Sequence, residues 1–154
     1  MGLYEKLCMD NNHIEVEEVT FLPSFQPGCY INGKIYIKHN ISDIRKAEVM
    51  FEELGHHEKT YGDILDQTKW INRKFESYAV RHGYQAALPF RLIIEAYHYG
   101  VSNLYELSQY VQLGEDYIIE ILEFYKQKYG LSTCYNGYVI IFEPLQVFEH
   151  HEIN

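Results

Sequence analysis

The chain has 154 residues, of which 47% are hydrophobic, and its formal net charge is −9. The apolar content, with fifteen tyrosines and eight phenylalanines, excludes a disordered chain and predicts one domain, or a domain with a small appendage, around a buried core. The acidic excess argues against a domain that binds nucleic acid by itself, because contact with phosphates requires a basic surface.

The cysteines and the apolar runs bear on location. Cys8, Cys29 and Cys134 are odd in number, widely spaced and without a C-x-x-C pair, which fits a reducing compartment and excludes a cysteine zinc site. No apolar run approaches the length of a membrane-spanning helix, and the N-terminus lacks the basic-then-apolar pattern of a signal peptide. We therefore expect a soluble cytoplasmic protein.

The first forty residues predict a short helix and three strands. The helix is expected over 2–12, and the alternation in 13–19 is typical of an antiparallel strand with one wet face, although the pattern slips at Glu18. Segment 29–37 predicts a β-hairpin, because Asn32-Gly33 suits a two-residue type I′ turn in which both residues have positive φ.

A helix is expected from Ser42 to Thr60, with Ser42 as its N-cap. It contains E-E-L-G-H, which differs by one residue from H-E-x-x-H, the zinc-peptidase motif whose two ligands share a helix face and whose Glu is the base. Glu52 and His56 project within about 40° of each other, with Glu53 beside them. A carboxylate can also bind zinc. The same residues equally fit a solvated helix face.

A second helix is expected from an N-cap at Asp66 towards Gly83, and Glu76 lies on it, twenty residues after His56. A carboxylate from the following helix is the third ligand that a helical zinc peptidase requires, and the alternative is a surface glutamate in a charged stretch. These elements form the expected first domain, a metallopeptidase-like core with a metal site over 1–88.

The expected second part, 89–154, is helical and packed on the core. We expect three helices here, over 90–99, 104–111 and 116–129, and the last two give the outline of a helix-turn-helix. A hairpin at Asn136-Gly137 would follow as a wing-like pair of strands through Phe142, with a frayed end after it. The exposed helix carries four acidic and two basic residues: Glu115, Asp116, Glu120, Glu123, Lys126 and Lys128. Because such a helix would repel phosphate, we interpret this part as a protein-docking or packing element and disfavour a transcription factor.

Three segments together carry a resemblance to a known family. Residues 52–57 read E-E-L-G-H-H, residues 72–81 read N-R-K-x-E-x-x-A-x-R, and residues 103–107, N-L-Y-E-L, precede a tyrosine-rich helix that ends at Gly130. Over roughly residues 10 to 130 the chain resembles the ImmA/IrrE family of zinc metallo-endopeptidases, in particular the small versions encoded by temperate phages and mobile elements.

The resemblance implies an α+β fold with a small zincin-like metallopeptidase domain. It also implies a Zn²⁺ ion bound by Glu52, His56 and Glu76, with Glu53 as the general base, although Glu52 stands where the family has its first His. The implied activity is cleavage of a helix-turn-helix transcriptional repressor encoded nearby, through zinc that polarises the scissile carbonyl and activates water.

Two points stay open at this stage. The group that stabilises the oxyanion is not identified, and His82, Tyr84 and Tyr61 are candidates. Because Glu52 makes the ligand set more anionic, the alternative function is a catalytically impaired, peptidase-like protein that binds and inhibits a repressor stoichiometrically.

Overall fold

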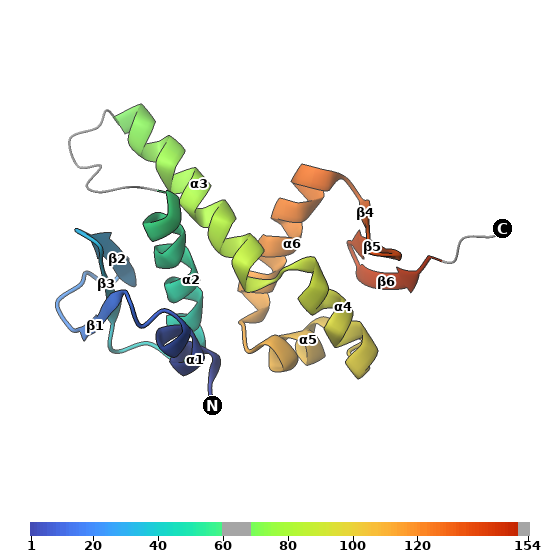
Figure 1. The fold of residues 1–154 in the computed structure, drawn as a ribbon, viewed down its shortest axis with the longest axis horizontal. Helices are drawn as coiled ribbons and strands as arrows, with labels where there is room; N and C mark the ends of the chain where they lie inside the picture. Colours follow the sequence, from blue (N-terminus) through green and yellow to red (C-terminus); the bar gives the residue numbers. More distant parts are fainter. Residues whose placement is uncertain (60–68, 151–154) are drawn as a thin grey trace. The chain divides into compact units, whose positions relative to one another are not determined.

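The computed structural model describes residues 1–59 and 69–150, and the side chains of 1–58 and 77–150. The chain is a mixed α+β protein, as expected (Figure 1). It divides into two compact units, Met1–Ala87 and Leu88–Asn154, called here the N-terminal and C-terminal units. The expected packing of the second unit on the first stays a prediction.

The helices and strands of the described residues follow the chain in one order. They are α1 (Leu3–Asp10), β1 (Glu15–Val19), β2 (Gly28–Ile31), β3 (Lys34–Lys38), α2 (Asp43–Lys59), α3 (Lys69–Ala87), α4 (Phe90–Tyr99), α5 (Leu104–Val111), α6 (Glu115–Tyr129), β4 (Ser132–Tyr135), β5 (Tyr138–Phe142) and β6 (Leu145–Glu149). None of the described helices is both long and apolar enough to cross a membrane. The expected N-cap Asp66 lies outside the described residues.

The N-terminal unit packs helices on one face of a small sheet with strand order β1-β3-β2. Ile35 and Ile37 of the central strand β3 are fully buried, because alternate residues of a strand point to the same face. They form the core with Ile14 and with Val49 and Met50 of α2. The hairpin between β2 and β3 turns at Asn32 and Gly33, whose φ angles of 51° and 79° are those of the expected turn.

The expectation that 13–19 forms an antiparallel strand is wrong. β1 pairs with β3 in parallel, with Val16 opposite Ile35, and the other pair of this sheet, β2–β3, is antiparallel. Alternation reports that one face of a strand is covered, and a covered face exists in parallel and antiparallel pairs alike. The direction of the neighbouring strand is therefore absent from the pattern.

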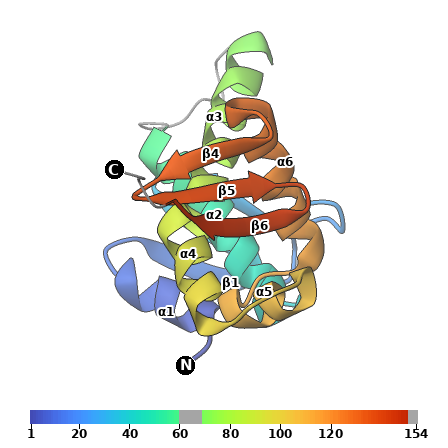
Figure 2. The same cartoon turned by 90° about the vertical axis from the view of Figure 1, so that its right-hand side faces the viewer.

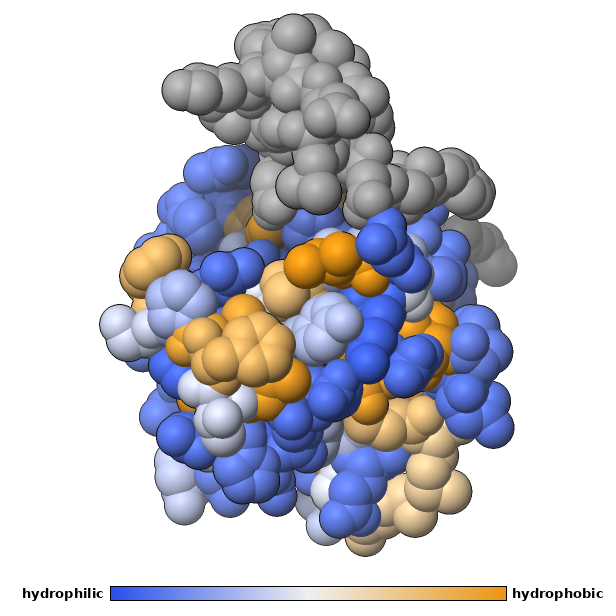
Figure 3. Space-filling model, turned by 90° about the vertical axis from the view of Figure 1, so that its left-hand side faces the viewer, coloured by the Kyte–Doolittle hydropathy of each residue, from blue (hydrophilic) through white to orange (hydrophobic). Residues whose placement is uncertain are grey.

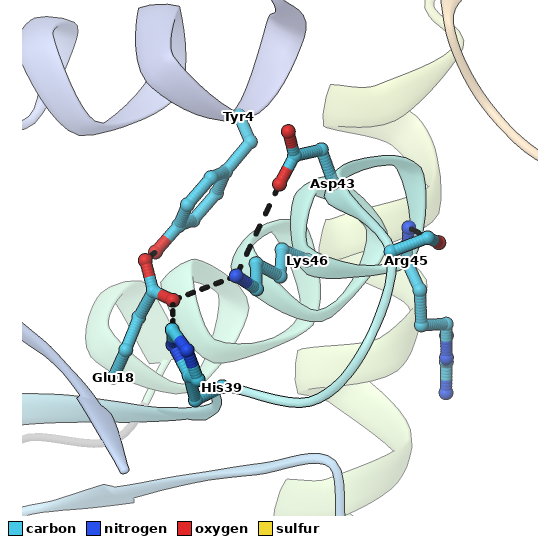
Figure 4. Close-up of polar contacts among 7 residues, drawn as sticks. Tyr4, Glu18, His39, Asp43, Arg45 and Lys46 are labelled. Atoms are coloured by element: carbon cyan, nitrogen blue, oxygen red, sulfur yellow. Dashed lines mark hydrogen bonds and ion pairs between the residues drawn. The ribbon is translucent and has the colours of Figure 1, made fainter.

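A polar network joins α1, the sheet and α2 (Figure 4). Lys46 of α2 is buried, and its Nζ lies 2.6 Å from Oε1 of Glu18. The hydroxyl of Tyr4 donates to Oε2 of the same carboxylate at 3.2 Å, and Nδ1 of His39 lies 3.0 Å from Oε1. The hydrogen bond from Lys46 is the main cause that lowers the pKa of Glu18, against the opposing effect of burial. The network therefore fixes the start of α2 on the sheet.

The C-terminal unit packs α4, α5 and α6 with a second sheet, of order β4-β5-β6 (Figure 2). Ile118 and Ile121 of α6 and Ile140 of β5 are fully buried in its core. Asn103 caps α5, since its Oδ1 accepts from the backbone N–H of Glu106 at 2.8 Å. The helix-turn-helix outline and the Asn136-Gly137 hairpin are therefore present as expected.

The third strand of this sheet was not expected. β6 pairs antiparallel with β5, with Val147 opposite Ile140, where the sequence suggested only two strands and a frayed end. Its weak pattern of two half-buried aliphatic residues and one exposed Phe148 explains the omission, because such a segment does not stand out from a tail.

Candidate metal centre

Helix α2 carries the E-E-L-G-H segment, and its first turn is built as the sequence predicts. The hydroxyl of Ser42 accepts from the backbone N–H of Arg45 at 3.1 Å, which satisfies one of the free donors of the helix start. From there α2 is continuous to Lys59, so Glu52 and His56 lie one turn apart on the same side of one helix. His56 is 9% exposed and Glu52 is half-buried.

Glu53 faces the sheet and lies against strand β2. It is 5% exposed, and a Cβ placed on Gly28 would lie 3.4 Å from its Oε1 and 2.4 Å from Cγ1 of Val49. A glycine at the start of β2 therefore lets α2 approach the strand, and the carboxylate occupies the space beside it. The pKa of the neighbouring Cys29 thiol is raised, first by burial and then by the negative charge of Glu53. Both observations place the Glu53 carboxylate beside β2.

Helices α2 and α3 meet at small residues. A Cβ on Gly55 would lie 2.2 Å from the carbonyl oxygen of Ala79, which is itself fully buried, and a Cβ on Gly83 would lie 3.0 Å from the carbonyl oxygen of Phe51. The backbones therefore touch, and α3 runs directly alongside the turn of α2 that carries Glu52 and His56.

The proposed third ligand, Glu76, belongs to α3, and its side chain lies outside the described part of the chain. It precedes Ala79 by three residues, and residues three apart lie on nearly the same side of a helix. Position 76 of α3 is therefore about one turn from Ala79, where α3 meets α2. Ligation by Glu76 stays a prediction, as does the expected role of Tyr61, which also lies outside the described residues.

The donors that are described fit zinc in kind. An imidazole and a carboxylate one helical turn apart are a common pair of zinc ligands, and a second carboxylate would complete a three-ligand set. Among the described side chains, no cluster of three or more His, Cys, Asp and Glu residues is close enough to hold a metal ion. The side chain of Glu76 is not among those described, so the absence of such a cluster does not test the predicted ligand set of Glu52, His56 and Glu76.

A second group of side chains beside the centre was not singled out from the sequence. Nδ1 of His57 lies 3.0 Å from the hydroxyl of Tyr30 on β2, and the two rings are 5.7 Å apart in an edge-to-face arrangement. The exposed His13 meets the same His57 ring at 6.2 Å, also edge to face. The sequence spacing could have indicated this group, because His57 follows Glu53 by four residues and therefore lies on the same side of α2.

The described oxyanion candidates are both half-buried residues of α3. Nδ1 of His82 is buried and has no hydrogen-bond partner among the described residues, whereas Tyr84 takes part in an interaction. Both roles in oxyanion stabilisation stay predictions.

The loop before β2 and the end of that strand expose apolar side chains. Figure 3 shows the side on which β1, β2 and β3 lie in Figure 1, where apolar patches are separated by hydrophilic surface. Exposed apolar side chains include Phe21 and Phe25, both in the loop that leads into β2, and Ile31 at the end of that strand.

Comparisons of the chain with protein-family models, with curated proteins and with solved structures give no match. The interpretation of this centre therefore depends on its own residues and their geometry.

Proposed function

We propose that this protein is a zinc-dependent endopeptidase of a temperate phage or mobile element, which cleaves a helix-turn-helix repressor in the cytoplasm of the bacterial host. One observation carries the proposal. A buried carboxylate, Glu53, lies beside an edge strand and is adjacent on α2 to the Glu52–His56 pair. Burial of a charge costs free energy, and a carboxylate buried at this position fits the role of a general base held beside a substrate.

Glu52 and His56 of α2 and Glu76 of α3 would hold the zinc ion. When bound, the ion supplies Lewis acidity that polarises the scissile carbonyl and lowers the pKa of water. The extra carboxylate at position 52 adds negative charge to the set, which reduces that Lewis acidity relative to a set with two histidines.

Glu53 supplies the proton transfers. Its carboxylate accepts a proton from the water that attacks the peptide carbonyl, and it then delivers a proton to the amide nitrogen as the C–N bond breaks. Burial between α2 and the start of β2 restricts the rotamers of Glu53, so that its carboxylate is held in place before the substrate binds.

Strand β2 offers a binding edge for an extended substrate. It is the outer strand of the order β1-β3-β2, and the backbone N–H of Lys38 donates to the carbonyl of Pro27 at 2.8 Å. Hydrogen-bonded pairs alternate along an antiparallel ladder, so the backbone groups of Gly28 and Tyr30 point away from β3. A peptide paired with that edge would pass Glu53.

Glu52 favours one alternative, a protein that binds its repressor and inhibits it without cleavage. In that case the N-terminal unit would keep the fold of a peptidase and bind the repressor, and its weakened zinc ligand set would not support cleavage. The two functions differ in the fate of the partner and in stoichiometry.

The test uses the purified repressor encoded beside this chain. The wild type should convert it into two fragments at a substoichiometric enzyme ratio in the presence of zinc, as seen by mass spectrometry. Glu53→Gln should bind zinc and the repressor without cutting it, because the amide cannot accept the proton. Glu58→Gln is the matched control, an exposed glutamate of the same helix, and it should cut normally.

A companion variant separates the two functions. Glu52→His restores a second imidazole, and it should raise zinc affinity, measured by calorimetry, and the cleavage rate. If the wild type and Glu53→Gln relieve repression equally in cells at a one-to-one ratio with the repressor intact, the stoichiometric function is correct and the peptidase is excluded.

A further inference from the structure

The C-terminal unit contains an apolar groove of about 810 Å³, unrelated to the metal centre. It is lined by β6, by the end of α4, by the start of α5 and by one side of α6. Figure 2 shows β6 as the strand of the second sheet nearest α5. The groove therefore opens along the outer strand of that sheet.

Apolar side chains that the core does not bury line this groove. Leu122 is only half-buried although it lies on the apolar side of α6, and Ile119 of the same helix is 51% exposed. Leu145 and Val147 of β6 pair with the buried Phe142 and Ile140, so they point to the helix-facing side, where the groove lies. The arrangement leaves apolar surface that a partner could cover.

The backbone of β6 also has an open edge. β6 is an outer strand in the order β4-β5-β6, and the N–H of His150 donates to the carbonyl of Gly137 at 2.7 Å. Because the paired positions alternate, the backbone groups of Val147 point away from β5. Within the described residues no strand lies on that side. An unpaired edge beside an apolar groove is the arrangement that binds extended peptides by strand addition.

Charge indicates the kind of peptide. Glu143, at the turn before β6, forms an ion pair with Lys126 of α6, and Glu123 of the same helix adds a further negative charge to the groove lining. Both carboxylates raise the pKa of Lys126, Glu143 first. The surrounding unit, 88–154, has nine acidic residues and three basic ones. A segment with lysines or arginines would be attracted to this rim, and an acidic segment would be repelled.

We propose that the groove binds an extended segment of a protein partner in which apolar and basic residues alternate, and that this segment adds a strand to β6. Its apolar side chains, which share the helix-facing side of the sheet with Leu145 and Val147, enter the groove. Its basic side chains lie on the opposite face, and the acidic excess of the unit attracts their charge. β6 is five residues long, about 17 Å, so the bound segment spans five to seven residues. The inference stands apart from hydrolysis, because binding here needs neither Glu53 nor a metal.

The test uses the full chain and a fluorescently labelled heptapeptide of alternating lysine and valine with blocked ends, followed by fluorescence anisotropy. We expect saturable binding that weakens as salt is raised. A peptide with proline at the central position should bind at least tenfold more weakly, since proline cannot pair with the strand edge. The glutamate-valine peptide should show no binding.

Two pairs of variants locate the site on the protein. Val147→Pro removes the outward N–H of β6 and should weaken binding about tenfold, whereas Cys134→Pro, at an outward position of the opposite edge strand β4, should leave it unchanged. Glu123→Lys should weaken binding about fivefold. Glu120→Lys makes the same charge change on the same helix without lining the groove, and should have little effect.

Several outcomes would overturn the proposal. Equal loss of binding in Val147→Pro and Cys134→Pro, with unchanged thermal melts, would mean that the β6 edge is not the site. Undiminished binding of the proline peptide would mean that the occupant is not a strand. A dimer that Val147→Pro dissociates, seen by sedimentation, would mean that the edge serves a second copy of the chain. Loss of cleavage in Glu53→Gln with intact peptide binding would leave this inference standing.

Discussion

At the scale of single residues, Glu18 explains a defect in the sequence pattern. The alternation of 13–19 fails there because an acidic residue takes a position on the covered side of β1. The structure supplies the reason, since the buried ammonium of Lys46 lies 2.6 Å away and requires a negative partner. What looks like an interruption of a strand is one half of the ion pair that ties the strand to α2.

We predict that Glu18→Gln lowers the free energy of unfolding by about 1–2 kcal/mol near neutral pH. This figure lies between those for fully exposed and fully buried ion pairs, because the Glu18 side chain is 32% exposed. Since the pKa of Glu18 is lowered in the folded state, its contribution is present above the unfolded value of about 4.3 and is lost as pH falls through the folded pKa.

Urea denaturation from pH 7 to pH 3 measures this effect. The groups that face Glu18 are Tyr4 of α1, His39 after β3 and Lys46 of α2, with Asp43 next to Lys46. The difference between wild type and variant should shrink as the pH falls, and Glu5→Gln on the exposed side of α1 should show no such trend. A difference that is constant across this range would refute the ion-pair account.

At the scale of elements, the contact of α2 with α3 depends on the absence of side chains. The two backbones approach at Gly55 and Ala79, so the turn of α2 that carries Glu52 and His56 lies close to α3, the helix to which Glu76 belongs. In the sequence, Gly55 looks like a weak point in a helix, since glycine is a poor helix former. The role of Gly55, which is to let α3 pack closely against α2, follows only from the tertiary structure.

We predict that Gly55→Ala destabilises the protein by about 2–3 kcal/mol, the cost of overpacking a tight contact. In an exposed helix the same substitution would stabilise by about 1 kcal/mol. The sign of the change, measured by thermal or urea unfolding, therefore reports on the helix contact. Glu58→Ala, at an exposed position of α2, is the control and should change stability little. An unchanged or raised melting temperature for Gly55→Ala would mean that the helices do not touch there.

At the scale of the whole molecule, the topology of the C-terminal unit suggests DNA binding, whereas the charge of the chain argues against it. The C-terminal unit has helices and strands in the order of a winged helix-turn-helix, yet its α6 begins with Glu115 and Asp116 and the chain has a net charge of −9. Acidic residues in the first turn stabilise a helix through its dipole, and they also repel phosphate. The topology alone therefore does not imply DNA binding.

We predict that the full chain has no measurable affinity for duplex DNA at about 150 mM salt, because few counterions can be released by so few basic residues. Fluorescence anisotropy with a labelled duplex of random sequence checks this, and a basic helix-turn-helix protein serves as the positive control. Tight binding that falls steeply with salt would contradict the prediction and favour a transcription factor.

The sequence by itself determined the local features of this protein. The N-caps at Ser42 and Asn103, the two Asn-Gly turns and the Glu52–His56 spacing all follow from interactions within a few residues, so they are encoded where they occur. The α+β class follows from the periods of successive segments.

Only the tertiary structure decided which distant surfaces meet. The parallel pairing of β1 with β3, the position of Glu53 beside Gly28 and the His57–Tyr30 pair join segments that are far apart in the chain. The pairing of β6 with β5 is local, and its weak pattern left it out of the prediction. Periodicity reports that a face is covered and does not report what covers it. The free energy of packing the whole unit selects which element covers each face. Arrangements that look alike locally then differ through single features, such as a close backbone approach at a glycine or one ion pair.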